Sequence, residues 1–119
     1  MLIRLSLACS NWVNSERVNV VDNLRTHEVD ELLTVLSRLD DPDTIYALLQ
    51  DLFTVREIRD TSQRLQVARM LAKKNSYTAI EAATGASATT IARVSKCLSY
   101  GAGGYAAALE VLEESGAQE

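Results

Sequence analysis

Residues Asn75–Leu98 read NSYTAIEAATGASATTIARVSKCL, and this stretch decides the fold because it contains two short helices separated by a glycine. Ser76 is placed to cap the first helix, YTAIEAAT, and Gly85 supplies the left-handed backbone that ends it. The side chains expected on its inner face are Tyr77, Ile80 and Thr84. Ser87 is placed to cap a second helix almost at once. The spacing therefore predicts two helices joined by a short turn.

The second of these helices has one apolar face and one face with little bulk. Ile91, Val94 and Leu98 recur at helical spacing, with a cysteine at the edge of their face. The side chains that face away are Thr89, Ala92, Arg93 and Lys96. Two helices, a glycine turn and a bare outer face are typical of a helix-turn-helix, which places its second helix in the major groove of DNA. We expect this motif at about 76–99.

The residue types on that face suit contacts with DNA. Threonine and alanine meet thymine methyl groups or base edges without steric conflict. Arg93 is suited to bidentate recognition of guanine, whereas Lys96 is better suited to a phosphate contact. The pattern thus indicates a DNA-binding protein.

The rest of the chain predicts four further helices. EVDELLTVLSRL at 28–39 repeats its apolar residues at spacings of three and four, and a second helix follows the Asp-Pro pair at 41–42. A central helix of about five turns is expected to begin after Thr54 and to end near Lys74, because neither glycine nor proline interrupts it. YAAALEVLEE at 105–114 predicts the last helix.

Charge is distributed unevenly along the 119 residues, whose formal net charge is -4. Residues 56–100 carry eight basic and three acidic residues, a balance of +5, while the remainder carries four basic and 13 acidic residues, a balance of -9. A polyanion responds to the local field, so the positive segment favours a nucleic-acid partner. The hydrophobic content of 47% with only 5% aromatic residues indicates a small aliphatic core, which often needs a partner subunit.

Catalysis and metal binding are not expected. Cys9, Cys97 and His27 lie too far apart in the sequence to form a zinc site, and the two thiols form no CxxC pair. The aspartates at 40–43 are better explained by capping a helix than by acid–base chemistry. No set of nucleophile, base and metal ligand has catalytic spacing, so the sequence does not predict an enzyme.

The first 21 residues are expected to be separate from the helical domain. MLIRLSLACSN at 1–11 has too short an apolar run for a signal sequence, and Ser6 interrupts it. Residues 1–21 predict a flexible arm or the product of a mis-assigned start, and residues 22–115 predict one helical domain. No segment approaches the roughly 20 apolar residues of a membrane span, and isolated thiols fit a reducing compartment, so we expect a cytoplasmic protein.

Residues Asn75–Leu98, the preceding TSQRLQVARML and the following SYG resemble the Trp repressor family, in particular its YerC/YecD subgroup. The similarity extends from about Asp22 to Leu112. It implies an all-α, six-helix Trp-repressor-like fold with a helix-turn-helix, assembled as an intertwined homodimer that binds double-stranded DNA. It further implies a sequence-specific DNA-binding transcriptional regulator that acts as a repressor.

The resemblance also implies two sets of site residues. The DNA-binding set is Ala88, Thr89, Thr90, Ala92, Arg93 and Lys96. The set at the family's effector pocket is Thr54, Arg64, Arg93, Val94 and Cys97. Val94 stands where the family has glycine and Cys97 where it has serine, so overlap with an indole and a weaker hydrogen bond are expected. We therefore expect L-tryptophan to bind weakly or not at all, and no cofactor.

An alternative function stays open at this point. The acidic residues outside 56–100 also fit a helical dimer that acts through protein–protein contacts without specific DNA binding. Salt dependence separates the two functions, since phosphate contacts weaken steeply as salt rises and an apolar interface does not.

Overall fold

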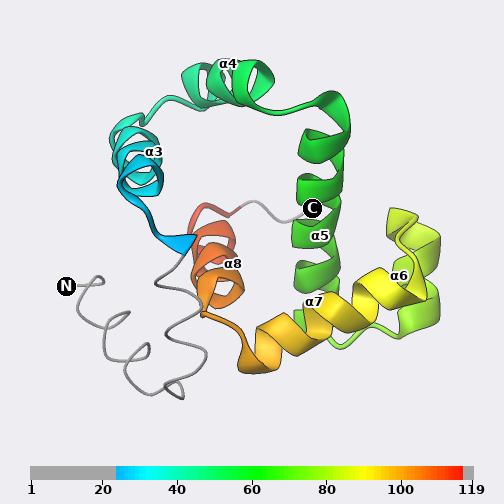
Figure 1. Ribbon diagram of the computed structural model, residues 1–119. Coiled ribbons are helices and arrows are strands. Elements are labelled where there is room, and N and C mark those ends of the chain that lie inside the picture. The colour runs from blue at the N-terminus through cyan, green and yellow to red at the C-terminus, as the bar shows by residue number, and fades with distance from the viewer. Residues whose placement is uncertain (1–23, 117–119) are drawn as a thin grey trace. The chain divides into compact units, whose positions relative to one another are not determined.

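The computed structural model describes residues 24–116, and the regular elements of that range are six α-helices (Figure 1). The all-α fold class is confirmed. The predictions for residues 1–21, including those for Cys9 and the start site, lie outside the described residues. None of the helices in residues 24–116 combines the length and the apolar composition needed to cross a membrane.

The chain divides into two compact units, Met1–Val55 and Arg56–Glu119. The helices of the first unit are α3 (His27–Arg38) and α4 (Pro42–Leu52). The second unit contains nearly all of α5, and its helices are α5 (Val55–Ala72), α6 (Tyr77–Thr84), α7 (Ala88–Tyr100) and α8 (Gly104–Glu114).

Local hydrogen bonds define the helix starts in the first unit. The Asp41 carboxylate accepts from the backbone N–H of Thr44 at 3.0 Å and from its hydroxyl at 2.7 Å, which confirms the predicted N-cap of α4. The hydrogen bond from the Thr44 hydroxyl is the largest cause that lowers the pKa of the Asp41 carboxyl, ahead of the bond from the Thr44 backbone N–H. Neither α3 nor α4 contains a buried residue, and Leu33 and Leu52 are 42% and 51% exposed. The apolar faces of these helices are thus incompletely covered within one chain.

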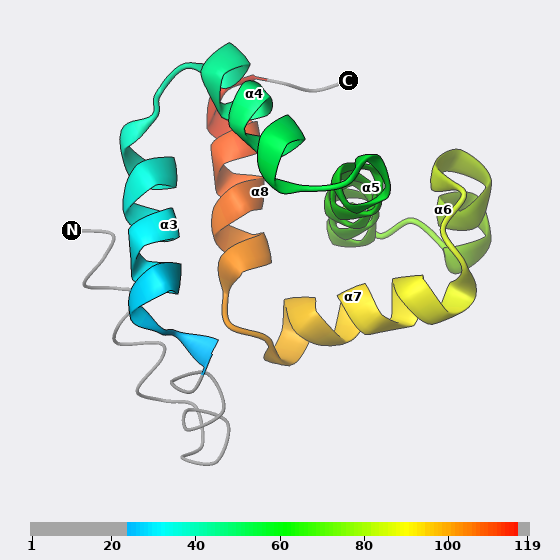
Figure 2. The same ribbon diagram turned by 45° about the horizontal axis from the view of Figure 1, so that its top comes forward.

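The core of the second unit is a small aliphatic cluster. Its buried members are Val67, Ala68, Ile80, Ala86, Ile91 and Val94. They come from α5, α6, the turn after α6, and α7, so one cluster joins three helices. The helices α6 and α8 lie at opposite ends of α7 (Figure 1 and Figure 2). Leu98 and Tyr105 are partly buried and extend the packing toward α8.

The central helix has the expected length of about five turns and ends near Lys74, as predicted. Its last residue is Ala72, because Lys74 has a left-handed backbone, with φ of 69°. The backbone N–H of Lys74 donates to the carbonyl of Leu71 at 2.9 Å, and that of Asn75 donates to the carbonyl of Met70 at 3.1 Å. This pair of bonds is a Schellman motif, here with lysine in the position that glycine usually occupies.

The predicted motif forms as two capped helices with a tight turn. Ser76 accepts from the N–H of Ala79 at 3.1 Å, and Ser87 accepts from that of Thr90 at 3.2 Å. Gly85 has φ of 78° and ends α6, as expected. Tyr77 was expected on the inner face, but as the first residue of α6 it is 42% exposed.

A side chain of α5 holds the turn of the motif. The Nε2 amide of Gln63 donates to the carbonyl of Thr84 at 3.1 Å across 21 residues of sequence. The Thr84 hydroxyl donates to the carbonyl of Ile80 at 2.8 Å and accepts from the N–H of Ala86 at 3.1 Å. These hydrogen bonds satisfy polar groups of the turn, and the bond from Gln63 attaches the turn to α5.

We predict that Gln63→Ala lowers the free energy of unfolding by about 1 kcal/mol, because the carbonyl of Thr84 loses its side-chain partner. Urea denaturation measures this change. Gln66→Ala is the matched control, since Gln66 is exposed on the same helix. Equal effects of the two substitutions would show that the Gln63 hydrogen bond contributes nothing.

Candidate nucleic-acid interface

The outer face of α7 presents almost all of the predicted DNA-binding residues to solvent. Its exposed members are Ala88, Thr89, Ala92, Arg93 and Lys96. Thr90 differs, because it is half-buried and its hydroxyl accepts from the Ser87 hydroxyl at 3.2 Å as part of the helix cap. Tyr100, which the sequence prediction did not include, follows Lys96 by four residues and is exposed on the same side of the helix.

This face is electrostatically positive. Within residues 24–116, neither Arg93 nor Lys96 makes an ion pair, and α7 contains no acidic residue. The helix dipole adds partial positive charge at the N-terminal end, next to Ser87 and Ala88. Positively charged side chains without an ion-pair partner attract DNA phosphates, and the small side chains beside them allow a DNA groove to approach closely.

The residues expected at the effector pocket differ in their exposure to solvent. Val94 is 1% exposed and belongs to the aliphatic cluster, so its methyl groups fill the core of the unit. Cys97 is an exposed free thiol, and Arg93 is exposed on the outer face of α7.

The other two residues of that set lie on or beside α5. Arg64 is half-buried, and its Nη2 donates to the Thr61 hydroxyl at 3.5 Å. Thr54 immediately precedes α5 and belongs to the first unit, whereas Arg64 belongs to the second.

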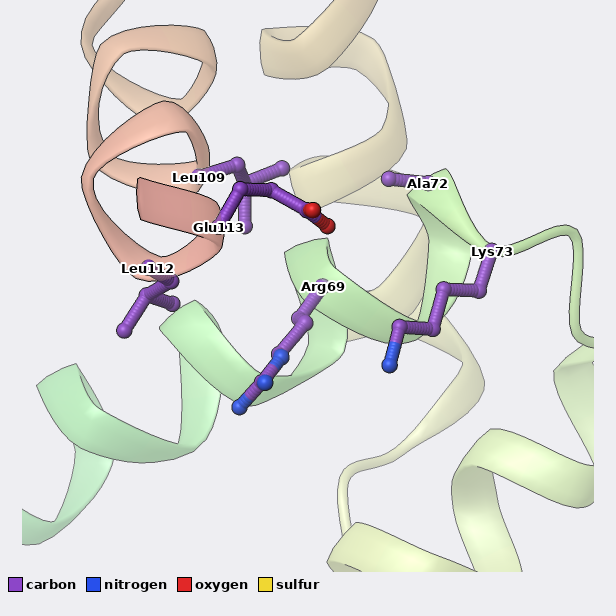
Figure 3. Close-up of a pocket in the computed structure, with 6 residues that line it drawn as sticks. All are labelled: Arg69, Ala72, Lys73, Leu109, Leu112 and Glu113. Carbon is purple, nitrogen blue, oxygen red and sulfur yellow. The ribbon is translucent and has the colours of Figure 1, made fainter. Parts of the chain in front are cut away.

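A small cavity lies elsewhere in the second unit, between α5 and α8 (Figure 3). Its volume is about 100 Å³, well below the roughly 300 Å³ at which ligand pockets usually begin. The residues that line it are Arg69, Ala72, Lys73, Leu109, Leu112 and Glu113. In Figure 3 the cationic groups of Arg69 and Lys73 point away from the Glu113 carboxylate, so the charged groups do not converge on a common ligand.

Comparisons with known proteins agree with this geometry. Residues 27–113 match the model of the Trp repressor protein family. The uncharacterised protein YerC of Bacillus subtilis (strain 168) is 44% identical over 95 residues, which cover 80% of this chain and 91% of YerC. The crystal structure of a TrpR-like protein from Eubacterium eligens superposes with a TM-score of 0.73 at 39% identity, covering 82% of this chain and 98% of that one. A further crystal structure, from Staphylococcus aureus, gives a TM-score of 0.73 at 36% identity, covering 82% and 95%. The chain therefore belongs to the Trp repressor family and resembles its YerC subgroup.

Proposed function

We propose that this protein is a sequence-specific DNA-binding transcriptional regulator that represses its target genes. The observation that carries the proposal is the outer face of α7, where Arg93 and Lys96 are exposed beside small side chains and make no ion pair within the described residues. A helix with this face is complementary to the major groove in both shape and charge. Membership of the Trp repressor family supports the same function.

The proposed acting form is a homodimer. Each of α3, α4 and α8 lacks a buried residue, and Leu33, Leu52 and Val111 are between 42% and 61% exposed. Apolar helix faces of this kind are stabilised when a second chain covers them. Two copies of α7 in a symmetric dimer read a palindromic site.

We propose further that L-tryptophan does not control DNA binding. Val94 stands at the family's glycine position and is packed into the core, and Cys97 stands at its serine position. A valine at that position takes up space that the family's glycine leaves open, and the thiol of Cys97 makes a weaker hydrogen bond than the serine hydroxyl.

A helical dimer that acts through protein contacts is the second candidate function. The partly exposed leucines and valine on α3, α4 and α8 favour it, because they offer apolar surface for a partner protein.

We predict that the full chain sediments as a dimer with twice the monomer mass of 13.0 kDa. Leu33→Glu should shift the protein toward monomers, because it places a charge on the partly exposed apolar face of α3. Thr34→Glu is the charge-matched control, since Thr34 is exposed and points away from that face. A wild-type protein that sediments as a monomer at micromolar concentration would contradict the proposed assembly.

The proposed function is tested by capturing sheared genomic DNA with the purified protein at near-physiological salt and sequencing the retained fragments. We predict enrichment of a palindromic site. If no sequence is enriched, the result contradicts sequence-specific DNA binding and favours the protein-contact function.

Variants of Arg93 then separate base recognition from charge. Arg93→Ala should cost about 1–3 kcal/mol on the captured site and reduce discrimination between sites. Arg93→Lys should bind DNA with the same salt dependence but with less discrimination between sequences, because lysine cannot donate two parallel hydrogen bonds to one base. Equal specificity of the wild type and Arg93→Lys would argue against base contact by Arg93.

We also predict no micromolar binding of L-tryptophan in a calorimetric titration of the dimer, and the same set of captured fragments with and without this amino acid. The reason is that Val94 and Cys97 stand where the family has glycine and serine. Micromolar binding, or enrichment only in its presence, would show that the pocket can open.

A further inference from the structure

The row of exposed side chains on α7 continues to its last residue. Thr89, Arg93, Lys96 and Tyr100 follow one another at spacings of four, three and four, which places them on one side of the helix. All four are exposed, and Tyr100 is 69% exposed despite its large aromatic ring. We call this set the reading row. Tyr100 is the only member whose side chain combines a long reach with a neutral hydrogen-bond donor.

Backbone geometry fixes Tyr100 as the end of the helix. The N–H of Gly101 donates to the Cys97 carbonyl at 2.8 Å. A Cβ at Gly101 would come within 2.3 Å of that carbonyl oxygen, so this conformation requires glycine. The chain leaves the helix at Gly101, and the reading row ends with Tyr100.

The length of the row sets where Tyr100 lies on a DNA duplex, if α7 binds DNA as proposed above. Thr89 and Tyr100 are eleven residues apart, which corresponds to about 16 Å along a helix axis. The major groove is about 12 Å wide. When the N-terminal residues of α7 meet base edges and the helix axis crosses the groove, the C-terminal end lies at the edge of the groove, beside the phosphates.

The charges at this end of α7 favour a neutral donor. The last turn contains no basic residue, and the backbone carbonyls there carry partial negative charge. A long side chain with a hydroxyl at its tip keeps a phosphate at a distance from those carbonyls while donating to it. Lys96, one turn earlier, supplies the positive charge.

We propose that the Tyr100 hydroxyl donates a hydrogen bond to a DNA phosphate at the edge of the major groove. This contact orients α7 in the groove and carries no sequence information of its own. The inference rests on the proposed DNA-binding function and adds to it a phosphate contact.

The experiment measures the affinity of the full-length dimer for the captured site and for a scrambled duplex at several salt concentrations. Tyr100→Phe removes only the hydroxyl, and we expect about three- to tenfold weaker binding to both duplexes with an unchanged salt slope. Lys96→Ala should instead lower the slope by about 0.9, because it removes a charge. Ser99→Ala, at an exposed neighbouring position off the reading row, should bind like the wild type.

Four outcomes would overturn the assignment. If Tyr100→Phe binds both duplexes as the wild type does while Lys96→Ala is impaired, DNA binding stands and the phosphate contact fails. If the loss is confined to the captured site, Tyr100 contacts a base. If Tyr100→Ala sediments as a monomer and Tyr100→Phe binds normally, the ring belongs to a subunit interface. A wild type that binds neither duplex overturns the proposed function together with this inference.

Discussion

The contact of Val67 and Ala68 with the aliphatic side chains of the motif is the interaction on which the second unit depends. These two residues are the wholly buried part of α5, and the cluster they complete includes one buried residue of α6 and two of α7. Neither short helix can bury its apolar face alone. Because α5 provides a common surface for both, the outer face of α7 has a defined direction relative to the rest of the unit.

Features that arise from near neighbours in the sequence were predicted well. The caps at Asp41, Ser76 and Ser87 and the left-handed Gly85 each depend on hydrogen bonds or backbone preferences within a few residues, and the structure confirms them. The apolar and exposed faces of α7 also follow from its periodicity alone. The exposed, small and basic side of the candidate site was accordingly visible in the sequence.

Features that depend on distant residues or on strained backbone were not visible. The bond from Gln63 to Thr84 spans 21 residues, and no local pattern indicates which polar side chain of α5 meets the turn. The left-handed conformation of Lys74 contradicts the preference of its residue type, so the sequence did not indicate the Schellman motif that ends α5. The spacing of Val94 with Ile91 predicted its position in the core, which the structure confirms, whereas its role toward a ligand stays a prediction.

Salt acts in opposite directions on the cohesion of the second unit and on its attraction for polyanions. The described part of this unit buries no polar or charged side chain, so its packing is held by the hydrophobic effect. Sulfate and similar anions strengthen apolar burial, while any added electrolyte reduces the counterion release that favours binding to a nucleic acid. In concentrated sulfate the helices of this unit are thus held together more firmly, while the positively charged face of α7 attracts a polyanion less.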